Sequence, residues 1–326
     1  MKMSTETLAL NPAALKRYSL SGATMGTRYS AIFYAPAGLD ETQVAQRLFS
    51  AVNSVDQQMS NWQADSALSR LNAAPVQTWV TLPKALIGVL QTALCIGQQS
   101  KGAFDIAVGD LVNAWGFGAA QSQPNLQHIA QLQNQARQPA TALLELDPGN
   151  LRVRKLAAVS LDLCGIAKGF GVDELARALD GCGVSRYLVG IDGEMRARGC
   201  KADGQPWTVA VEKPVRGIRE VMGVMELSDV AIATSGDYRH WVEVADRLYS
   251  HSMHPILAAP LCNQLTAVTV LASSCMLADA WATALMVLGE VAGPQLAQEL
   301  GLHALFVLRD GDSFREILVV DGQLQS

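Results

Sequence analysis

The segment Leu161-Asp162-Leu163-Cys164-Gly165-Ile166-Ala167-Lys168-Gly169 joins a short apolar run to a run with helical periodicity. Residues 161–163 predict a strand, and residues 168–179, which are followed by Gly181, predict a helix. Backbone amides at a helix N-terminus and a lysine ammonium together form a site suited to an anion. The alternative is an ordinary helix start with a solvated lysine. The segment therefore predicts a strand-to-helix connection, with or without a bound anion.

Strand-like and helix-like patterns alternate irregularly on both sides of this segment. The expected strands cover residues 28–34, 187–191, 207–212, 304–308 and 316–320, and the expected helices cover residues 40–59, 86–96 and 278–288. A polar, glutamine-rich stretch at 121–139 is expected to be a surface connection. Because several strands form hairpin-like pairs, we expect an α+β fold and not a doubly wound sheet.

The chain length limits the number of domains. Its 326 residues are enough for one large domain or for two fused lobes. We expect residues 1–17 to form a flexible N-terminal tail and residues 18–326 to form a single domain.

Composition and charge exclude several classes of protein. The net charge of -5 argues against nucleic acid as the main partner, because phosphate binding needs clustered lysine and arginine. No stretch of about eighteen apolar residues appears, which predicts that no segment spans a membrane. Six scattered cysteines favour buried thiols in a reducing compartment, although their even number also permits disulfides. Since the N-terminus lacks an apolar signal segment, we expect a cytoplasmic protein.

Several common catalytic motifs are missing from the sequence. It contains no GxGxxG after a strand, no P-loop, no GxSxG and no HExxH. Its five histidines are scattered, which makes a zinc site improbable. Any chemistry is therefore expected to rely on carboxylates, hydroxyls and a hard cation.

The apolar helix expected at 278–288 contains one acidic and one hydroxyl side chain on the same face. Asp279 and Thr283 are four residues apart, and their neighbours are apolar. A carboxylate on such a helix is costly unless it is paired or bound to a metal, and carboxylate and hydroxyl oxygens suit Mg²⁺. The alternative is that Asp279 caps free amides at the helix N-terminus.

Two further groups of residues are weaker signals. Gly102-Ala103-Phe104-Asp105, followed by Trp115-Gly116-Phe117-Gly118, suits a planar ligand but is also typical of a glycine-rich turn with aromatic core residues. Hydroxyls in residues 234–239 are suited to phosphate, and His251 and His254 are suited to acid–base chemistry, to a weak metal pair or to surface positions.

Taken together and in order, these segments resemble the family of FAD:protein FMN transferases, the ApbE family. The resemblance covers nearly the whole chain from about residue 18. Its further segments are Thr24-Met25-Gly26-Thr27-Arg28-Tyr29, Met59-Ser60-Asn61-Trp62 and Ser69-Arg70-Leu71-Asn72.

The resemblance implies an α+β fold of two intimately associated α/β lobes with a flavin cleft between them. It implies a Mg²⁺-dependent enzyme that cleaves FAD and attaches FMN through a phosphoester to a serine or threonine of an acceptor protein, with release of AMP. FAD is implied to contact Met25, Trp62, Ala103, Phe104, Asp105, Asp162 and Lys168. Mg²⁺ is implied to bind the carbonyl of Gly165 and the side chains of Asp279 and Thr283. We expect Asp279 and the base His251 to be catalytic.

Two departures from the family pattern affect the acceptor step. The run after His251 is Ser252-Met253-His254-Pro255-Ile256-Leu257-Ala258-Ala259, where the family has an Asp, a Thr and a Gly. The family's paired glycines before an acid are altered to Ile191-Asp192-Gly193-Glu194. Two alternatives therefore stay open: an FAD pyrophosphatase that releases free FMN and AMP, and a non-catalytic FAD-binding protein.

The acceptor is expected to be a flavoprotein with a Ser/Thr-Gly-Ala-Ser/Thr segment. Ser21-Gly22-Ala23-Thr24 of this chain resembles that segment, but Tyr18 stands where the acceptor has an acid. We interpret it as the entry to the first strand and not as a site of self-modification.

Overall fold

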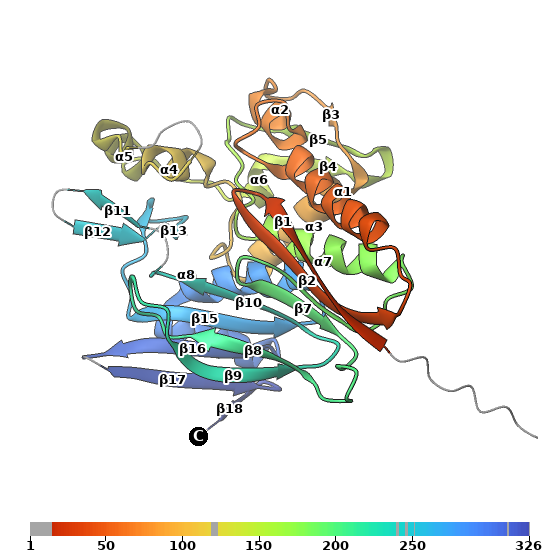
Figure 1. Cartoon of the computed structure of the whole chain (residues 1–326). Helices are drawn as coiled ribbons and strands as arrows, with labels where there is room; N and C mark the ends of the chain where they lie inside the picture. Colours follow the sequence, from red (N-terminus) through yellow and green to blue (C-terminus); the bar gives the residue numbers. More distant parts are fainter. Residues whose placement is uncertain are drawn as a thin grey trace, which may run out of the picture.

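One large antiparallel sheet organises the molecule (Figure 1). The computed structural model describes residues 15–118, 123–238, 241–244, 247–250, 252–311 and 313–325. Within this part of the chain, nine strands pair in the order β1-β2-β6-β7-β10-β15-β16-β17-β18. Their bounds are β1 Leu15–Thr24, β2 Thr27–Pro36, β6 Tyr187–Ile191, β7 Glu194–Arg198, β10 Ala231–Gly236, β15 Leu265–Ala272, β16 His303–Asp310, β17 Ser313–Val320 and β18 Gln323–Gln325.

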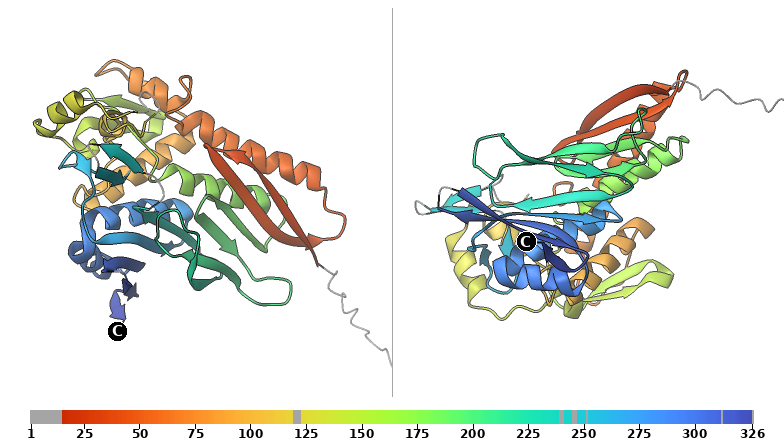
Figure 2. Two further views of the ribbon diagram at one scale, coloured as in Figure 1. Left: turned by 60° about the vertical axis from the view of Figure 1, so that its left-hand side comes forward. Right: turned by 90° about the horizontal axis from the view of Figure 1, so that it is seen from below.

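Helices cover one face of this sheet, and a separate hairpin covers the other. α7 (Ala167–Asp180) contacts β6 and β7, while α8 (Cys275–Glu299) contacts β10 and β15. α1 (Glu41–Met59) packs on α7, and α3 (Lys84–Gln99) packs on α8. The views in Figure 2 show α7 and α8 against the sheet. On β10, Ala231 packs on the helical side and Ile232 contacts the hairpin of β8 (Trp207–Glu212) and β9 (Val221–Leu227), since successive side chains alternate between faces.

The smaller elements lie around the helical layer. α2 (Ala67–Ala73) follows α1, and a three-stranded sheet contains β3 (Val80–Thr81), β5 (Arg152–Lys155) and β4 (Leu144–Asp147), with η1 (Pro148–Asn150) between β4 and β5. α6 (Ala140–Leu143) packs on α3. α4 (Gly109–Ala114) and α5 (Leu126–Gln133) share an apolar cluster with the segment that connects β10 to β15. That segment carries β11 (Trp241–Val244), β12 (Arg247–Ser250), β13 (Met253–His254) and β14 (Ala259–Pro260).

α8 is the central helix of the core. Among the described residues, it is the helix that is long and apolar enough to cross a membrane by length and composition, although 61% of its apolar window is buried inside the protein. Gly289, with φ +79°, interrupts its helical geometry. The burial of α8 is what a core helix of a packed domain requires, and it carries Asp279 and Thr283 into that core.

The α+β class is confirmed, and so are the strands and helices expected outside three regions. Residues 161–163 are not a strand, because the backbone of Leu161 pairs with the side chain of Asn72: the Leu161 N–H donates to Asn72 Oδ1 at 2.8 Å, and Asn72 Nδ2 donates to the Leu161 carbonyl at 2.9 Å. The connection expected at 121–139 contains α5, which buries Ile129 and Leu132 and is capped by Asn125.

The third difference concerns the expected tail. β1 begins at Leu15, so residues 15–17 belong to a strand paired with β2 instead of to a tail. Residues 1–14 lie outside the described residues. Ser21 to Thr24 pair with residues 27–30 of β2, which places the acceptor-like segment inside the first hairpin.

Candidate active site

The buried carboxylate of Asp279 lies at the meeting point of α7 and α8. Ser274 caps α8, so the interpretation of Asp279 as the cap of its own helix is wrong. Asp279 is 5% exposed, and its Oδ2 accepts the backbone N–H of Gly169 at 2.9 Å. It therefore occupies the second turn of α8 and caps an amide in the first turn of the neighbouring helix α7.

Thr283 and Gly165 lie one helical turn further along this contact. A Cβ added to Gly165 would lie 3.0 Å from Thr283 Oγ1 and 3.3 Å from Phe104, so a side chain at this position would crowd both neighbours. Ser235 Oγ on β10 lies 3.1 Å from Thr283 Oγ1. The structure thus brings together carboxylate and hydroxyl oxygens from α8, a hydroxyl from β10 and the backbone of the loop before α7.

Lys168 provides the positive charge beside this group. Its Nζ lies 2.7 Å from Glu194 Oε1 and 3.6 Å from Asp192 Oδ2. Burial acts to lower the pKa of Lys168, but the charges of Glu194, Asp279 and Asp192 outweigh it and raise that pKa above its ordinary value. The ammonium therefore stays protonated at neutral pH.

Burial, followed by the negative charge of Glu194, raises the pKa of Asp279 to about 7. A carboxylate in this position is stabilised by a cation next to it. The described residues contain no group of three or more His, Cys, Asp or Glu side chains that could hold a metal ion. The oxygens that could hold a hard cation here come instead from one carboxylate, hydroxyls and a carbonyl, which is a donor set that Mg²⁺ accepts.

Two asparagines fix the loop before α7. Asn61 Nδ2 donates to Asp162 Oδ2 at 2.8 Å, and the N–H of Cys164 donates to Asp162 Oδ1 at 2.8 Å. Asn72 holds Leu161 through the two bonds described above. Asp162 is thereby bound in a structural turn, and Gly165 and Lys168 follow it at fixed positions.

Met25 and Trp62 lie near this loop on the first hairpin and after α1. Met25 has φ +46° at the β1–β2 turn, and its methyl group would lie 2.9 Å from a Cβ on Gly171 of α7. Trp62 follows Asn61 and is 70% exposed. A large exposed aromatic ring next to the site can contact a planar ligand.

Ala103 and Phe104 belong to the core, and the partly buried Asp105 follows them. Ala103 and Phe104 are buried, and Asp105 accepts the backbone N–H groups of Ala107 at 2.8 Å and Ala140 at 3.1 Å. Burial raises the pKa of Asp105.

Trp115 is also buried, and its ring lies 5.1 Å from that of Tyr249. The interpretation of these aromatics as core residues is confirmed for Phe104 and Trp115.

The structure describes His254, one of the two histidines singled out in the sequence. His251 lies outside the described residues. His254 Nδ1 accepts the N–H of Leu257 at 3.3 Å, and burial lowers its pKa. That ring nitrogen is therefore engaged in the local turn.

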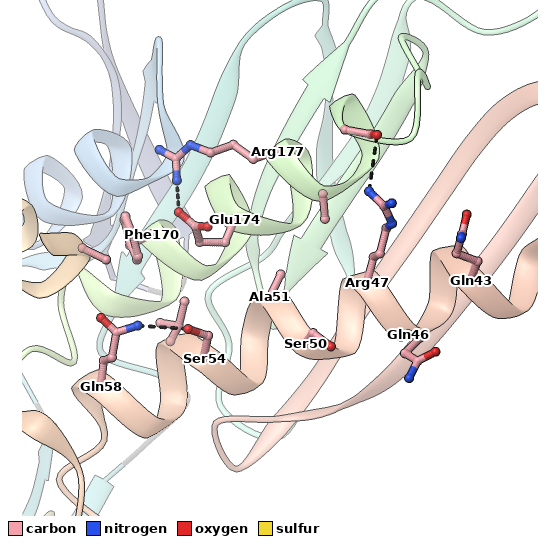
Figure 3. Close-up of a pocket in the computed structure, with 14 residues that line it drawn as sticks. Gln43, Gln46, Arg47, Ser50, Ala51, Ser54, Gln58, Phe170, Glu174 and Arg177 are labelled. Atoms are coloured by element: carbon pink, nitrogen blue, oxygen red, sulfur yellow. Dashed lines mark hydrogen bonds and ion pairs between the residues drawn. The ribbon is translucent and has the colours of Figure 1, made fainter. Parts of the chain in front are cut away.

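A large surface groove lies apart from these residues. It has a volume of about 680 Å³ between α1 and α7, and Figure 3 shows Gln58 beside Ser54 on one wall and Glu174 beside Arg177 on the other. None of the predicted site residues that the structure describes lines it. The chemistry of Asp279, Thr283 and Lys168 is thus separate from this groove.

The comparison with known families decides the classification. A family model described as the ApbE family matches residues 25–306. The chain belongs to the ApbE family. It is 37% identical to the FAD:protein FMN transferase of Vibrio cholerae over 299 residues, which cover 91% of this chain and 89% of the relative.

Further relatives agree with this membership of the ApbE family. The FAD:protein FMN transferase of Escherichia coli K12 is 34% identical over 91% of this chain and 85% of its own length. The solved structure titled flavin transferase ApbE from Vibrio cholerae superposes with a TM-score of 0.84 at 34% identity, over 94% of this chain and 98% of that chain. The expected fold of the ApbE family is therefore confirmed.

The sequence predicted only a general phosphate-binding role for the hydroxyls of residues 234–239, which include Ser235, and no role for Glu194 or Asp173, although all three residues build the site. Glu194 and Ser235 contact Lys168 and Thr283, and Asp173 of α7 accepts backbone amides of α8. A spacing pattern could not reveal these contacts, because each joins elements far apart in the chain. The only signal for Glu194 was its place in a segment that differs from the family pattern.

Proposed function

We propose that this protein is a Mg²⁺-dependent FAD:protein FMN transferase. The relatives named for that activity align with about nine-tenths of the chain. The observation that carries the proposal is the convergence of Asp279, Thr283 and Gly165 beside the protonated Lys168. A hard cation and an ammonium side by side suit a pyrophosphate.

The metal would be held by the Gly165 carbonyl and the side chains of Asp279 and Thr283. The buried carboxylate and the close approach of Gly165 to Thr283 support this fit. Bound Mg²⁺ would neutralise pyrophosphate charge and so make the phosphorus more electrophilic. Ser235 would orient the Thr283 hydroxyl through their 3.1 Å contact.

The remaining steps belong to residues of the chain. Lys168 would bind the pyrophosphate, exchanging part of its contact with Glu194 for the phosphate oxygens. The acceptor hydroxyl oxygen forms a bond to the FMN phosphorus, the bond from that phosphorus to the bridging oxygen breaks, and AMP leaves with that oxygen. We propose His251 as the base that removes the hydroxyl proton.

FAD would be bound by the residues around this loop. Trp62 would contact the flavin from its exposed position, and Met25 would contact it from the hairpin turn. Ala103, Phe104, Asp105 and Asp162 would shape the site; for Asp105 and Asp162, this means holding loops, because their oxygens already accept protein N–H groups.

The acceptor is proposed to be a flavoprotein with a Ser/Thr-Gly-Ala-Ser/Thr segment. The altered run from Ser252 to Ala259 includes Ile256 and Leu257, which are exposed, and it belongs to the segment between β10 and β15. Since β10 also carries Ser235, this segment leaves the sheet next to the site. We propose that this segment influences the choice of acceptor.

The experiment that tests the proposal offers the protein FAD, Mg²⁺ and a candidate acceptor, with mass spectrometry as the readout. The proposal predicts that the acceptor gains FMN and that an equal amount of AMP is released into solution. Free FMN with an unmodified acceptor would indicate a pyrophosphatase, and unchanged FAD would indicate a non-catalytic FAD-binding protein.

We also propose a cytoplasmic location. All six cysteines are free thiols in the structure. The expected burial holds for Cys275 alone and is wrong for Cys95, Cys164 and Cys262, which are exposed. Free thiols persist in reducing compartments. Alkylation of intact cells before lysis tests this: a disulfide-linked pair in the cellular protein would contradict it.

A further inference from the structure

Two aspartates cap each other's helices at the contact between α7 and α8. Asp279 of α8 accepts the Gly169 N–H in the first turn of α7. Asp173 of α7 accepts the Cys275 N–H on Oδ1 at 3.0 Å and the Met276 N–H on Oδ2 at 3.0 Å, in the first turn of α8. Each carboxylate thus satisfies amides that have no partner within their own helix and faces the positive end of that helix.

The spacing of the four residues fixes how the helices overlap. Gly169 and Asp173 are four apart on α7, and Cys275 and Asp279 are four apart on α8, so each pair shares one face. A Cβ on Gly169 would lie 2.3 Å from the Cys275 carbonyl oxygen. The two first turns therefore meet backbone to backbone, with no room for an intervening side chain.

The Asp173 carboxylate is itself held in place. It is 1% exposed, and Arg196 Nη1 of β7 lies 2.6 Å from its Oδ1. A buried carboxylate with one guanidinium and two backbone donors has little freedom to move. Asp173 thereby ties α8 to both α7 and the sheet.

This contact sets the distance between the two parts of the proposed metal site. Gly165 lies in the loop that leads into α7, whereas Asp279 and Thr283 lie on α8. We propose that Asp173 is a positioning residue that holds the α8 ligands against Gly165, and that its loss weakens Mg²⁺ binding. The proposal rests on the proposed function for the identity of the metal, but the helix contact can be tested without it.

The test compares Asp173→Asn with Asp180→Asn. Asparagine offers one acceptor oxygen and turns an amide group toward a backbone N–H, so one cap is lost. Asp180 is on the same helix, but its carboxylate pairs with Arg198 at 2.5 Å. Both measurements are made without FAD. The first is the Mg²⁺ midpoint, the Mg²⁺ concentration that gives half of the maximal rise in Tm. The second is the rate of backbone hydrogen exchange in residues 275–281.

We expect Asp173→Asn to raise the Mg²⁺ midpoint by about 10-fold or more, which is typical when an outer partner of a metal ligand is lost. Exchange should increase in residues 275–281. Asp180→Asn should change neither. A wild-type midpoint and wild-type exchange in Asp173→Asn, or equal losses in both variants, would overturn the proposal.

Two further measurements keep the proposal falsifiable. If Asp173→Asn does not fold, Arg196→Gln removes the cation that fixes the same carboxylate, and a Mg²⁺ midpoint and exchange equal to wild type would then overturn the proposal. If the wild-type protein shows no Mg²⁺ response at all, the proposed function fails, and the exchange data alone decide whether Asp173 holds α8.

Discussion

At the scale of single residues, Asp279 is a buried carboxylate of the candidate site. It is buried in an apolar helix, and its Oδ2 accepts the backbone N–H of Gly169. The same carboxylate is near Lys168 and Glu194, which affect its pKa in opposite directions. A substitution that keeps the volume of the side chain can separate the effect of the Asp279 charge on activity from the effect of its shape.

Asp279→Asn should therefore lower the rate of FAD cleavage by about 10²–10³-fold, because a neutral amide is a poor ligand for a hard cation. The amide oxygen can still accept the Gly169 N–H, so the fold should persist. AMP release measured by chromatography checks the rate, and Asp180→Asn is the matched control. Wild-type cleavage by Asp279→Asn would contradict the metal assignment.

At the scale of elements, the α7–α8 contact depends on a missing side chain. Gly169→Ala places a Cβ 2.3 Å from the Cys275 carbonyl oxygen, so the helices must separate. We expect a loss of about 1–3 kcal/mol in the free energy of unfolding, as for other overpacked cores. Urea unfolding measures this loss.

The matched control is Gly88→Ala in α3. No atom lies within 4 Å of a Cβ at Gly88, so the change should raise the free energy of unfolding by about 0.5–1 kcal/mol through helix propensity. Equal effects of the two substitutions would mean that the α7–α8 contact is not tightly packed.

The loop before α7 depends on Asn72 in a similar way. Asn72→Ala removes both hydrogen bonds to Leu161 and should cost about 2 kcal/mol of unfolding free energy. Because Asp162, Gly165 and Lys168 follow, the KM for FAD should also rise. Asn134→Ala, at the exposed end of α5, should leave both quantities unchanged. An unaltered KM in Asn72→Ala would show that this loop does not shape the FAD site.

The elements also show what a sequence can predict. The helix predicted at 40–59 is confirmed as α1. Its buried face consists of residues spaced three or four apart, which are Val44, Leu48, Val52, Val55 and Met59. The prediction of a strand at 161–163 is wrong, because an apolar triplet has the same pattern whether a strand or an asparagine side chain pairs with its backbone. The Asp279–Thr283 pair was found because four residues make one helical turn.

Partners from distant elements could not be found in the same way. Asp173 and Cys275, or Lys168 and Glu194, meet only because of the sheet order, which no local pattern encodes. Resemblance to the family supplied candidate positions for the site but not these supporting contacts.

At the scale of the whole molecule, metal binding should stabilise the fold, since the ligands come from α8 and from the loop before α7. Mg²⁺ at 100 times its Kd should add about 2.7 kcal/mol, which for a chain of this size is a rise in Tm of about 4 °C. EDTA should reverse the rise. Thermal melts with and without Mg²⁺ check this, with Asp279→Asn as the control; a shift of equal size in that variant would place the metal elsewhere.

Transfer of FMN at the Asp279 site is best tested by measuring both products of one reaction. Wild-type protein, FAD, Mg²⁺ and a flavoprotein with a Ser/Thr-Gly-Ala-Ser/Thr segment are incubated, and AMP and the acceptor mass are followed together. We predict one AMP for each acceptor that gains FMN, and neither product with EDTA or with Asp279→Asn. AMP without a change in acceptor mass would contradict FMN transfer, and FMN transfer that persists in Asp279→Asn would contradict the role of Asp279.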